Sequence, residues 1–314
     1  MKAVVLLSGG LDSLLAAKIV KEEKIGLIGV SFKSYFFDPP NIVRKQAEEL
    51  GIPLKIVDIS QEQLALVLSP RYGFGKGLNP CRDCHALMLK KAKEIMEEEQ
   101  ASFLVTGDVL GQRPFSQNLG ALKLIEGEAG AERLVLRPLS AKLLPPTLAE
   151  ERGLILREKL YSIKGKQRKE QLALAKAWGL KNYQTPAGGC LLTDPAFSQR
   201  LKDLLRVVPR PTASDLALLK LGRHFWDNNV LFVVGRNEEE NERLKKLGEK
   251  GDYLVELAEI PGPTVLARSF GQKISKGVKE KARQLVLDYA PKAKGEKVSF
   301  LAKGDNFSND GGKQ

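Results

Sequence analysis

The sequence has no long hydrophobic run and few cysteines. No apolar stretch among its 314 residues approaches the roughly 20 residues that a membrane-spanning helix needs. The N-terminus enters a β-branched run directly, without the basic and apolar regions of a signal peptide. Three cysteines are too few, and odd in number, for the disulfide framework of a secreted protein. We therefore expect a cytoplasmic protein with no membrane partner.

The chain is also without internal repeats, and its 314 residues suffice for two domains with separate cores. A hydrophobic content of 43% and a charged content of 28% are typical of a globular protein. The formal net charge of +12 favours a polyanionic partner, and nucleic acid is the first candidate. The alternative is a solvated surface rich in Lys and Glu, of the kind found in thermophilic proteins.

Strand and helix patterns alternate in the first half of the chain, which predicts the α/β class: a Rossmann-like parallel sheet with helices on both faces. The expected strands are 2–7, 26–32, 53–59, 103–108 and 134–139, and the expected helices are 12–23, 40–50 and 82–99. We expect this catalytic domain to cover residues 1–165. A connector with a basic helix at 166–178 then covers residues 166–190 and contains the third cysteine.

A smaller α+β domain is expected at residues 191–292. Its predicted helices are 194–206, 214–221 and 238–248, and its predicted strands are 229–235, 253–257 and 264–268. The end of the chain is poor in apolar residues, so we expect residues 293–314 to form a disordered tail.

The most informative motif is the glycine turn Ser8-Gly9-Gly10-Leu11-Asp12-Ser13, which follows the first expected strand. The glycines allow successive N–H groups to face one anion, and the following helix N-terminus adds to this site. Ser8 and Ser13 contribute hydroxyl donors. A carboxylate at Asp12 beside bound phosphates requires a bridging cation, so we assign Asp12 to Mg2+. The alternative is an ordinary strand–helix turn in which Asp12 is a favourable charge at a helix N-terminus.

This turn resembles the signature of the PP-loop ATP pyrophosphatases, which grip the pyrophosphate of ATP and adenylate a substrate oxygen. Residues 106–117 and the Arg137-Pro138-Leu139 segment resemble the 4-thiouridine synthases of tRNA within that family. Residues 113–115 add one position to that family's spacing. The resemblance implies an ATP site made of Ser8, Gly9, Gly10, Asp12, Ser13, Gly107, Gln112 and Ser116. It also implies that Asp108 borders the adenylate, that Gln117 lines the reaction pocket, and that Lys142 offsets phosphate charge.

The cysteines form a Cys81-x-x-Cys84 pair followed by a distant Cys190. Several PP-loop tRNA-thiolating enzymes hold a 4Fe–4S cluster with such a set, which leaves one iron free to bind sulfide. Three alternatives remain: a Cys84–Cys190 pair that carries persulfide, a Zn2+ site completed by His85, and inert buried thiols. The string from Cys81 to His85 also matches c-type haem attachment, but that reading requires export.

These parts fit a two-step reaction. A uridine carbonyl oxygen is a poor leaving group, and adenylation by ATP converts it to AMP, which sulfur can then displace. We therefore expect an ATP-dependent tRNA sulfurtransferase with catalytic residues Asp12, Cys84, Cys190, Asp108 and Lys142. One alternative is another PP-loop amidase or ligase, and another is an RNA-binding protein with a structural zinc site.

The second unit, at about residues 191–290, resembles the NFACT-type RNA-binding domain. The similarity lies in Gly222-Arg223-His224 and in Gly235-Arg236-Asn237 with the acidic and Asn residues that follow. It makes Arg223, His224, Arg236 and Asn237 the candidates for RNA contact, although Arg236 and Asn237 would also suit a helix cap.

We expect this protein to work without the ferredoxin-like, THUMP and rhodanese-like regions that are usual in 4-thiouridine synthases. We therefore expect the second unit to recognise tRNA and a partner to donate sulfur, as sulfide or from a cysteine desulfurase. The sequence leaves the oligomeric state open, and a homodimer is one possible assembly.

Overall fold

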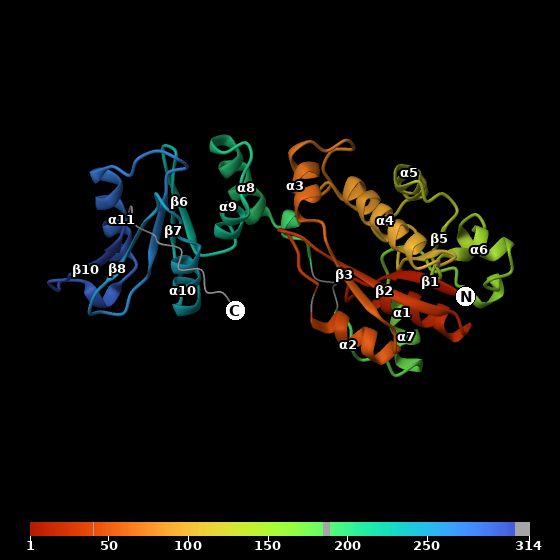
Figure 1. The fold of residues 1–314 in the computed structure, drawn as a ribbon. Coiled ribbons are helices and arrows are strands. Elements are labelled where there is room, and N and C mark those ends of the chain that lie inside the picture. The colour runs from red at the N-terminus through yellow and green to blue at the C-terminus, as the bar shows by residue number, and fades with distance from the viewer. Residues whose placement is uncertain (40, 185–188, 305–314) are drawn as a thin grey trace. The chain divides into compact units, whose positions relative to one another are not determined.

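A parallel sheet lies at the centre of the N-terminal unit of this computed structural model, which describes residues 1–39, 41–184 and 189–304 (Figure 1). The chain divides into two units, Met1–Asp194 and Pro195–Gln314. The N-terminal sheet consists of β3 (Leu54–Asp58), β2 (Gly26–Lys33), β1 (Lys2–Leu6), β4 (Leu104–Val105) and β5 (Val135–Leu136), in that order. All neighbouring pairs are parallel. The order reverses between β1 and β4, which is where such sheets bind ligands beyond the carboxyl ends of their strands.

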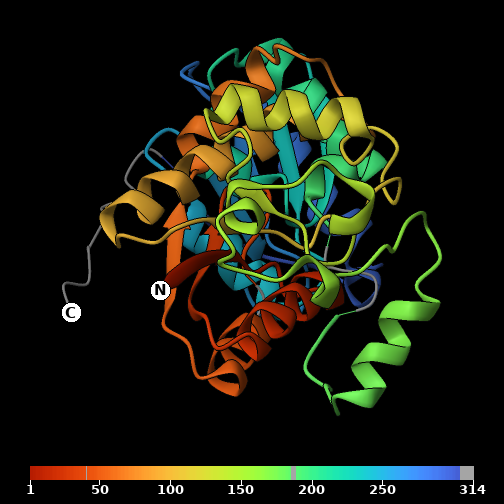
Figure 2. The same ribbon diagram turned by 90° about the vertical axis from the view of Figure 1, so that its right-hand side faces the viewer.

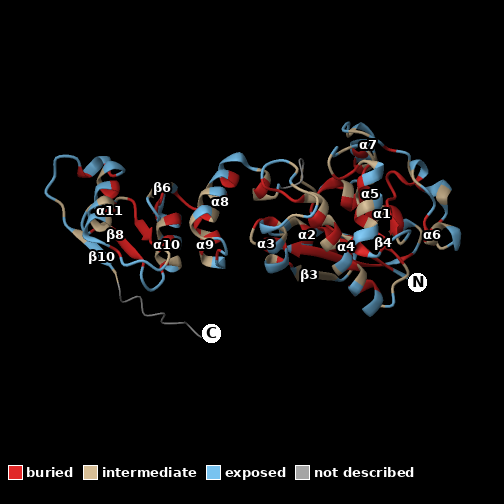
Figure 3. Cartoon of the chain, turned by 90° about the horizontal axis from the view of Figure 1, so that it is seen from above, coloured by how far each residue is buried: buried red, intermediate tan, exposed pale blue. Residues whose placement is uncertain are grey.

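Helices cover both faces of this sheet, as Figures 1 and 2 show. One face packs against α1 (Leu11–Glu22), α2 (Asn41–Leu50) and α7 (Lys169–Ala177). The other packs against α4 (Cys81–Glu98) and α5 (Leu119–Ala129). The side chains of β1 alternate, so Val5 joins the first core and Val4 joins the second. Both are fully buried, and Figure 3 shows strands of this sheet in red, the colour of buried residues, whereas the edge strand β3 is only partly buried. The predicted α/β class is confirmed.

Shorter elements connect the strands and helices of this unit. They are α3 (Ser60–Leu68), η1 (Ala141–Leu143), α6 (Leu148–Glu151), η2 (Arg157–Lys159) and η3 (Leu191–Thr193). The predicted connector is not a separate segment, because its helix α7 contributes Ala175 to the first core and contacts α1.

The C-terminal unit is built on an antiparallel sheet, which confirms the predicted α+β class. Its strands are β10 (Phe300–Lys303), β8 (Tyr253–Leu257), β9 (Val265–Arg268), β7 (Val230–Val234) and β6 (Arg223–Asp227), in that order. Its helices are α8 (Pro195–Val207), α9 (Ala213–Leu218), α10 (Glu238–Leu247) and α11 (Lys276–Asp288), with a 3-10 turn η4 at Pro291–Ala293. The sequence patterns did not predict β6 or α11.

The expected disordered tail at 293–314 is structured in its first part. Residues 300–303 form β10 and pair with β8, with Phe300 opposite Leu257. Phe300 packs against the core of this unit, which supplies the apolar contact that makes the strand stable. Residues 305–314 lie outside the described part. None of the described helices is long and apolar enough to cross a membrane.

Candidate functional site

The glycine turn closes on itself through its two serines. The Ser13 hydroxyl donates to the Gly10 carbonyl at 3.0 Å and accepts from the Ser8 N–H at 3.3 Å. Gly9 has a φ of 80°, a left-handed conformation that favours glycine. Helix α1 begins after Gly10 without a side-chain cap, so no side chain competes for the N–H groups of its first turn. Within the turn, the Ser8 N–H donates to Ser13 Oγ and the Gly10 N–H donates to Ser8 Oγ at 3.4 Å, so the N–H groups that the site offers to an anion are those of the first turn of α1.

Asp12 lies in the first turn of α1, and side chains from two distant segments contact its carboxylate. Gln112 Nε2 donates to Asp12 Oδ2 at 3.2 Å, and the Arg168 guanidinium lies 3.6 Å from the same oxygen. Burial raises the pKa of Asp12, and the contacts from Gln112 and Arg168 oppose that rise. Asp12 Oδ1 is buried and has no hydrogen-bond partner among the described residues. A buried carboxylate oxygen without a partner fits the inner coordination of Mg2+.

Two buried glutamines around this turn escaped the sequence analysis. Gln46, fully buried on α2, donates to the Gly9 carbonyl at 3.2 Å and to the Asn182 carbonyl at 2.7 Å. Gln171, fully buried on α7, lies near the Asp12 carboxyl and lowers its pKa. A polar residue on the apolar face of each expected helix was the signal that could have identified them.

Gly107 allows the 106–117 segment to lie against the glycine turn at residues 8–13. A Cβ atom at Gly107 would lie 2.4 Å from the Ser13 nitrogen and 2.6 Å from the Asp12 carbonyl carbon. These are backbone atoms of α1, so only glycine permits this approach. The structure thus joins the turn after β1 with the turn after β4, at the reversal of strand order.

Asp108, the next residue, is held inside the protein. It accepts from Thr106 Oγ1 at 2.8 Å and from Gln117 Nε2 at 2.9 Å. Burial alone would raise the pKa of Asp108, but the charge of the buried Arg137 lowers it below its usual value. Ser116 is only 2% exposed. Asp108 and Gln117 therefore fix the shape of this loop through their mutual contact.

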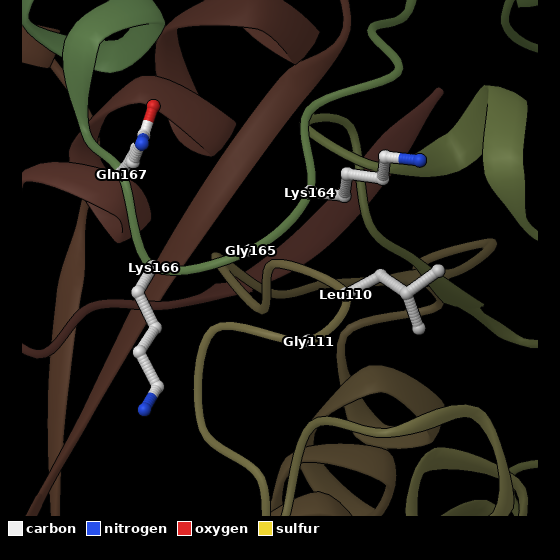
Figure 4. Close-up of a pocket in the computed structure, with 6 residues that line it drawn as sticks. All are labelled: Leu110, Gly111, Lys164, Gly165, Lys166 and Gln167. Carbon is white, nitrogen blue, oxygen red and sulfur yellow. The ribbon is translucent and has the colours of Figure 1, made fainter.

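A pocket of about 510 Å³ lies beside this loop, and its lining residues are Leu110, Gly111, Lys164, Gly165, Lys166 and Gln167 (Figure 4). The Gly165 N–H donates to the Leu110 carbonyl at 2.7 Å, which fixes the two walls next to each other. Arg168 follows the pocket directly and reaches Asp12. Lys142, the expected cation, instead lies exposed on η1 and donates to the Glu158 carbonyl at 3.0 Å.

The structure brings the three cysteines into one neighbourhood. Cys81 and Cys84 lie in the first turn of α4, and Cys190 precedes η3. The Leu78 N–H donates to the Leu192 carbonyl at 3.0 Å, which ties the segment before the pair to the segment after Cys190.

The pKa shifts of the cysteines agree with this proximity. Burial raises the pKa of Cys84 far above its usual value, and the neighbouring Cys190 and Cys81 raise it further. Burial raises the pKa of Cys190 to about 12, and Cys81 again adds to the effect. Gln63, fully buried on α3, donates to Cys84 Sγ at 3.3 Å. The donor set suits a soft metal, but in the described part of the chain no three Cys, His, Asp or Glu side chains are arranged to hold a metal ion.

In the C-terminal unit, three of the four expected RNA-contact residues are engaged within the protein. Asn237 caps α10 by accepting from the Glu240 N–H at 2.9 Å. Arg236 binds Glu240, and the guanidinium lowers the pKa of that carboxyl to about 2. His224 contacts the Leu218 carbonyl at 3.1 Å, and burial lowers its pKa to about 4. Arg223 is exposed, and its guanidinium lies 4.9 Å from the centre of the Tyr289 ring.

Two segments of the chain match family models. Residues 79–142 match the thiamine biosynthesis protein (ThiI) family, and residues 222–310 match the NFACT protein RNA binding domain. These matches confirm the two resemblances inferred from the sequence, to the tRNA-thiolating PP-loop enzymes and to the NFACT-type domain.

The curated proteins and solved structures that are similar to this chain match only part of it. The tRNA-specific 2-thiouridylase MnmA of Geobacter metallireducens is 30% identical over 131 residues, which are 34% of this chain and 34% of that protein. MnmA of Geotalea uraniireducens is 27% identical over 205 residues, 57% of this chain and 50% of the relative. A solved 4-thiouridine synthetase–RNA complex with bound ATP is 25% identical with a TM-score of 0.40, and the match covers 70% of this chain and 52% of that one. The chain thus spans between a third and a half of the length of these curated relatives. At the family level the similarity is to tRNA sulfurtransferases.

Proposed function

We propose that this protein is an ATP-dependent tRNA sulfurtransferase that adenylates a uridine carbonyl oxygen and then replaces it with sulfur. The observation that supports this most directly is the contact between Gln112 and Asp12 across 100 positions of sequence. This contact joins the pyrophosphate turn to the segment that matches the ThiI family. A nucleotide held at the turn would therefore face the loop of the tRNA-thiolating enzymes.

In this proposal the turn from Ser8 to Ser13 binds the pyrophosphate part of ATP through its N–H groups. Asp12 would hold Mg2+ through its unpartnered oxygen, and the ion would neutralise phosphate charge. Lys164 and Lys166, exposed beside the pocket, would offset the remaining charge together with Arg168. We assign them this role ahead of Lys142 because Arg168, which follows them directly, reaches Asp12.

The chemistry has two displacements. The uridine carbonyl oxygen attacks the α-phosphorus of ATP, the bond to the β-phosphate oxygen breaks, and pyrophosphate leaves. A sulfur nucleophile then attacks the activated carbon, the carbon–oxygen bond breaks, and AMP leaves with the original uridine oxygen. Gly107 would allow the loop that contains Asp108 to approach the adenylate, since its backbone lies against the N-terminus of α1.

For the sulfur step we propose the neighbourhood of Cys81, Cys84 and Cys190. These residues would hold a 4Fe–4S cluster, which when bound would offer an iron without a protein ligand to sulfide. A persulfide on Cys84 or Cys190 and a structural Zn2+ ion are the alternatives. Gln63 would orient sulfur at Cys84 in each case through its amide donor. For the cluster, the sulfur would come as free sulfide or from a cysteine desulfurase. For the persulfide, it would come as sulfane sulfur from the desulfurase, because sulfide lacks the oxidation level of a persulfide.

The activation step is tested by AMP and pyrophosphate release with unmodified tRNA and ATP. Asp12→Ala should lower tRNA-dependent AMP formation by at least a hundredfold, because it removes the ligand for Mg2+. Asp203→Ala, on α8 of the other unit, removes an equivalent carboxylate and should leave the rate unchanged. An absence of RNA-dependent AMP formation in the native protein would refute the proposal.

The sulfur site is tested by anaerobic purification followed by absorbance and by iron, sulfide and zinc analysis. Iron and acid-labile sulfide that disappear together in Cys84→Ser would support the cluster. Stoichiometric zinc in a colourless protein would exclude it. Sulfur released by cyanide from a metal-free protein would instead identify the persulfide.

A further inference from the structure

Charge is distributed unequally over the two faces of the C-terminal sheet. The stretch 236–259, which contains α10, has eight Asp and Glu against five Lys and Arg. The stretch 273–297, which contains α11, has eight Lys and Arg against three Asp and Glu. Each helix therefore lies in a stretch of sequence with one predominant sign of charge.

The two helices lie on opposite faces of the sheet, as Figure 1 also shows. Phe232 of β7 and Val255 of β8 point to one face, where they pack with Ala282 and Val286 of α11. Arg268 of β9 points to the other face, where it donates to the Leu247 carbonyl at the end of α10. The sheet thus separates the glutamate-rich helix α10 from the basic α11 face.

Aromatic rings hold the cations of the α11 face in place. Three side chains of α11 have their charged groups 5.6 Å from a ring centre. These pairs are Lys279 with Tyr253, Lys281 with Phe232, and Arg283 with Phe300. Arg223 of the neighbouring β6 lies 4.9 Å from the centre of the Tyr289 ring, which follows α11 directly. Such contacts restrict long side chains, so they lose less entropy when they bind an anion.

We propose that the α11 face, defined by Arg223, Lys276, Lys279, Arg283 and Tyr289, binds the phosphate backbone of RNA. Lys281 is left out of this surface because it pairs with Asp227 at 2.7 Å. This inference rests on the proposed function, because it assigns the surface through which the substrate tRNA is held. Tyr289 is 36% exposed and offers a ring on which an unpaired base can stack.

The first turn of α10, on the other side of the sheet, is a poor phosphate site. The first turn of α10 has three consecutive glutamates, Glu238, Glu239 and Glu240, and the nearby Arg236 is paired with the last of them. An RNA backbone there would meet like charge. Of the four residues expected from the sequence, only Arg223 therefore belongs to the proposed surface.

RNA fits the α11 face better than an anionic membrane does. Lys276, Glu280 and Arg283 are exposed on α11, and no large apolar side chain of this helix is exposed at their side. Interfacial helices need such apolar groups to insert between lipids. The cations here stand in polar surroundings, which suits contact with phosphates in water.

The test uses two full-length triple variants with the same loss of charge. The first, K276Q/K279Q/R283Q, changes the α11 face, and the matched control, R243Q/K246Q/K250Q, changes exposed cations of α10 and the loop after it. Binding of an unmodified tRNA transcript is measured by fluorescence anisotropy at several salt concentrations, with circular dichroism to confirm folding.

Each lost phosphate contact lowers the slope of log K against log salt by about 0.9, which is roughly eightfold in affinity at about 0.1 M salt. We expect the α11 variant to lose two or three contacts, about 60- to 500-fold, and the control to bind within twofold of the native protein. The charge-conserving variant K276R/K279R/R283K should bind RNA normally, which separates lost charge from lost structure.

Equal losses in both triple variants, or native affinity in the α11 variant, would overturn the proposed surface. Preferential binding to vesicles of phosphatidylserine and phosphatidylcholine over tRNA would overturn RNA as its occupant. The enzymatic proposal fails separately: a native protein that binds tRNA through α11 but forms no AMP refutes the reaction and leaves the surface intact.

Discussion

The substitution Gly107→Ala tests most directly the contact between the 106–117 segment and the glycine turn at residues 8–13. The new Cβ would lie 2.4 Å from the Ser13 nitrogen, whereas an ordinary contact begins at about 3.4 Å. The three atoms that it would meet all belong to the backbone of Asp12 and Ser13, so no flexible side chain can move aside. The turn after β4 must therefore move by about 1 Å from the N-terminus of α1. Such overpacking costs about 1–3 kcal/mol of unfolding free energy.

A displacement of 1 Å at a reaction centre costs roughly a hundredfold in rate. We therefore expect Gly107→Ala to lower tRNA-dependent AMP formation about a hundredfold, and urea denaturation to show the loss of stability. Gly127→Ala in α5 is the matched control, because its Cβ would meet nothing closer than 3.7 Å. That change should raise stability by up to about 1 kcal/mol, since alanine favours helix. Native activity and native stability in Gly107→Ala would refute the reasoning.

Three further predictions concern buried polar groups. Arg268→Met should lower the unfolding free energy of the C-terminal unit by about 3–5 kcal/mol, because it leaves the buried Asp215 and Asp252 unpaired. His224 has a pKa lowered to about 4 by burial, so its stabilising contribution is complete above its unfolded pKa of 6.5 and is lost as the pH falls through 4. Between pH 7.5 and 4.5 this amounts to about 2–3 kcal/mol in urea titrations, and His224→Gln should remove that part. Gln63→Leu should leave AMP formation within twofold and lower sulfur incorporation, measured by mass spectrometry of digested tRNA.

Each of these has an outcome that contradicts it. A native unfolding curve for Arg268→Met would mean that the two carboxylates find other partners. An unchanged pH dependence in His224→Gln would assign that dependence to another group. Equal losses of AMP and of thiolated product in Gln63→Leu would show that Gln63 supports the whole fold instead of the sulfur step.

Local patterns predicted the elements that have strong periodicity. The alternation of strands and helices in the first half identified the parallel sheet, and the Ser-Gly-Gly turn after β1 identified the place where α1 begins. The strands β4 and β5 were predicted longer than they are, because the predicted ranges included the Thr106–Asp108 turn and the Arg137–Leu139 segment, which lie beyond the ends of the paired strands. Strand β6 was missed because Arg223, His224 and Asp227 dilute its apolar character. Its pairing with β7 stabilises it all the same.

The residues around the candidate site were predictable only where a motif contains them. The pattern of 106–117 singled out Gln112, and the structure places it on Asp12. Gln46 and Gln171 belong to no motif, and only packing against the glycine turn gives them their positions. In the C-terminal unit the Gly-Arg-Asn motif suggested either RNA contact or a helix cap. The structure shows that Asn237 caps α10 and that Arg236 pairs with Glu240.

By itself the sequence determined the fold class, the phosphate-binding character of the first turn, and the presence of three cysteines with a basic second unit. These depend on residue type and local spacing, which the chain displays directly. Tertiary structure alone decided that Gly107 meets α1, that Cys190 lies near the Cys81-Cys84 pair, and that α10 and α11 lie on opposite faces of the second sheet. The physical reason is that these relations join residues far apart in sequence. Their proximity comes from the order of strands and from the side of each sheet on which a helix packs.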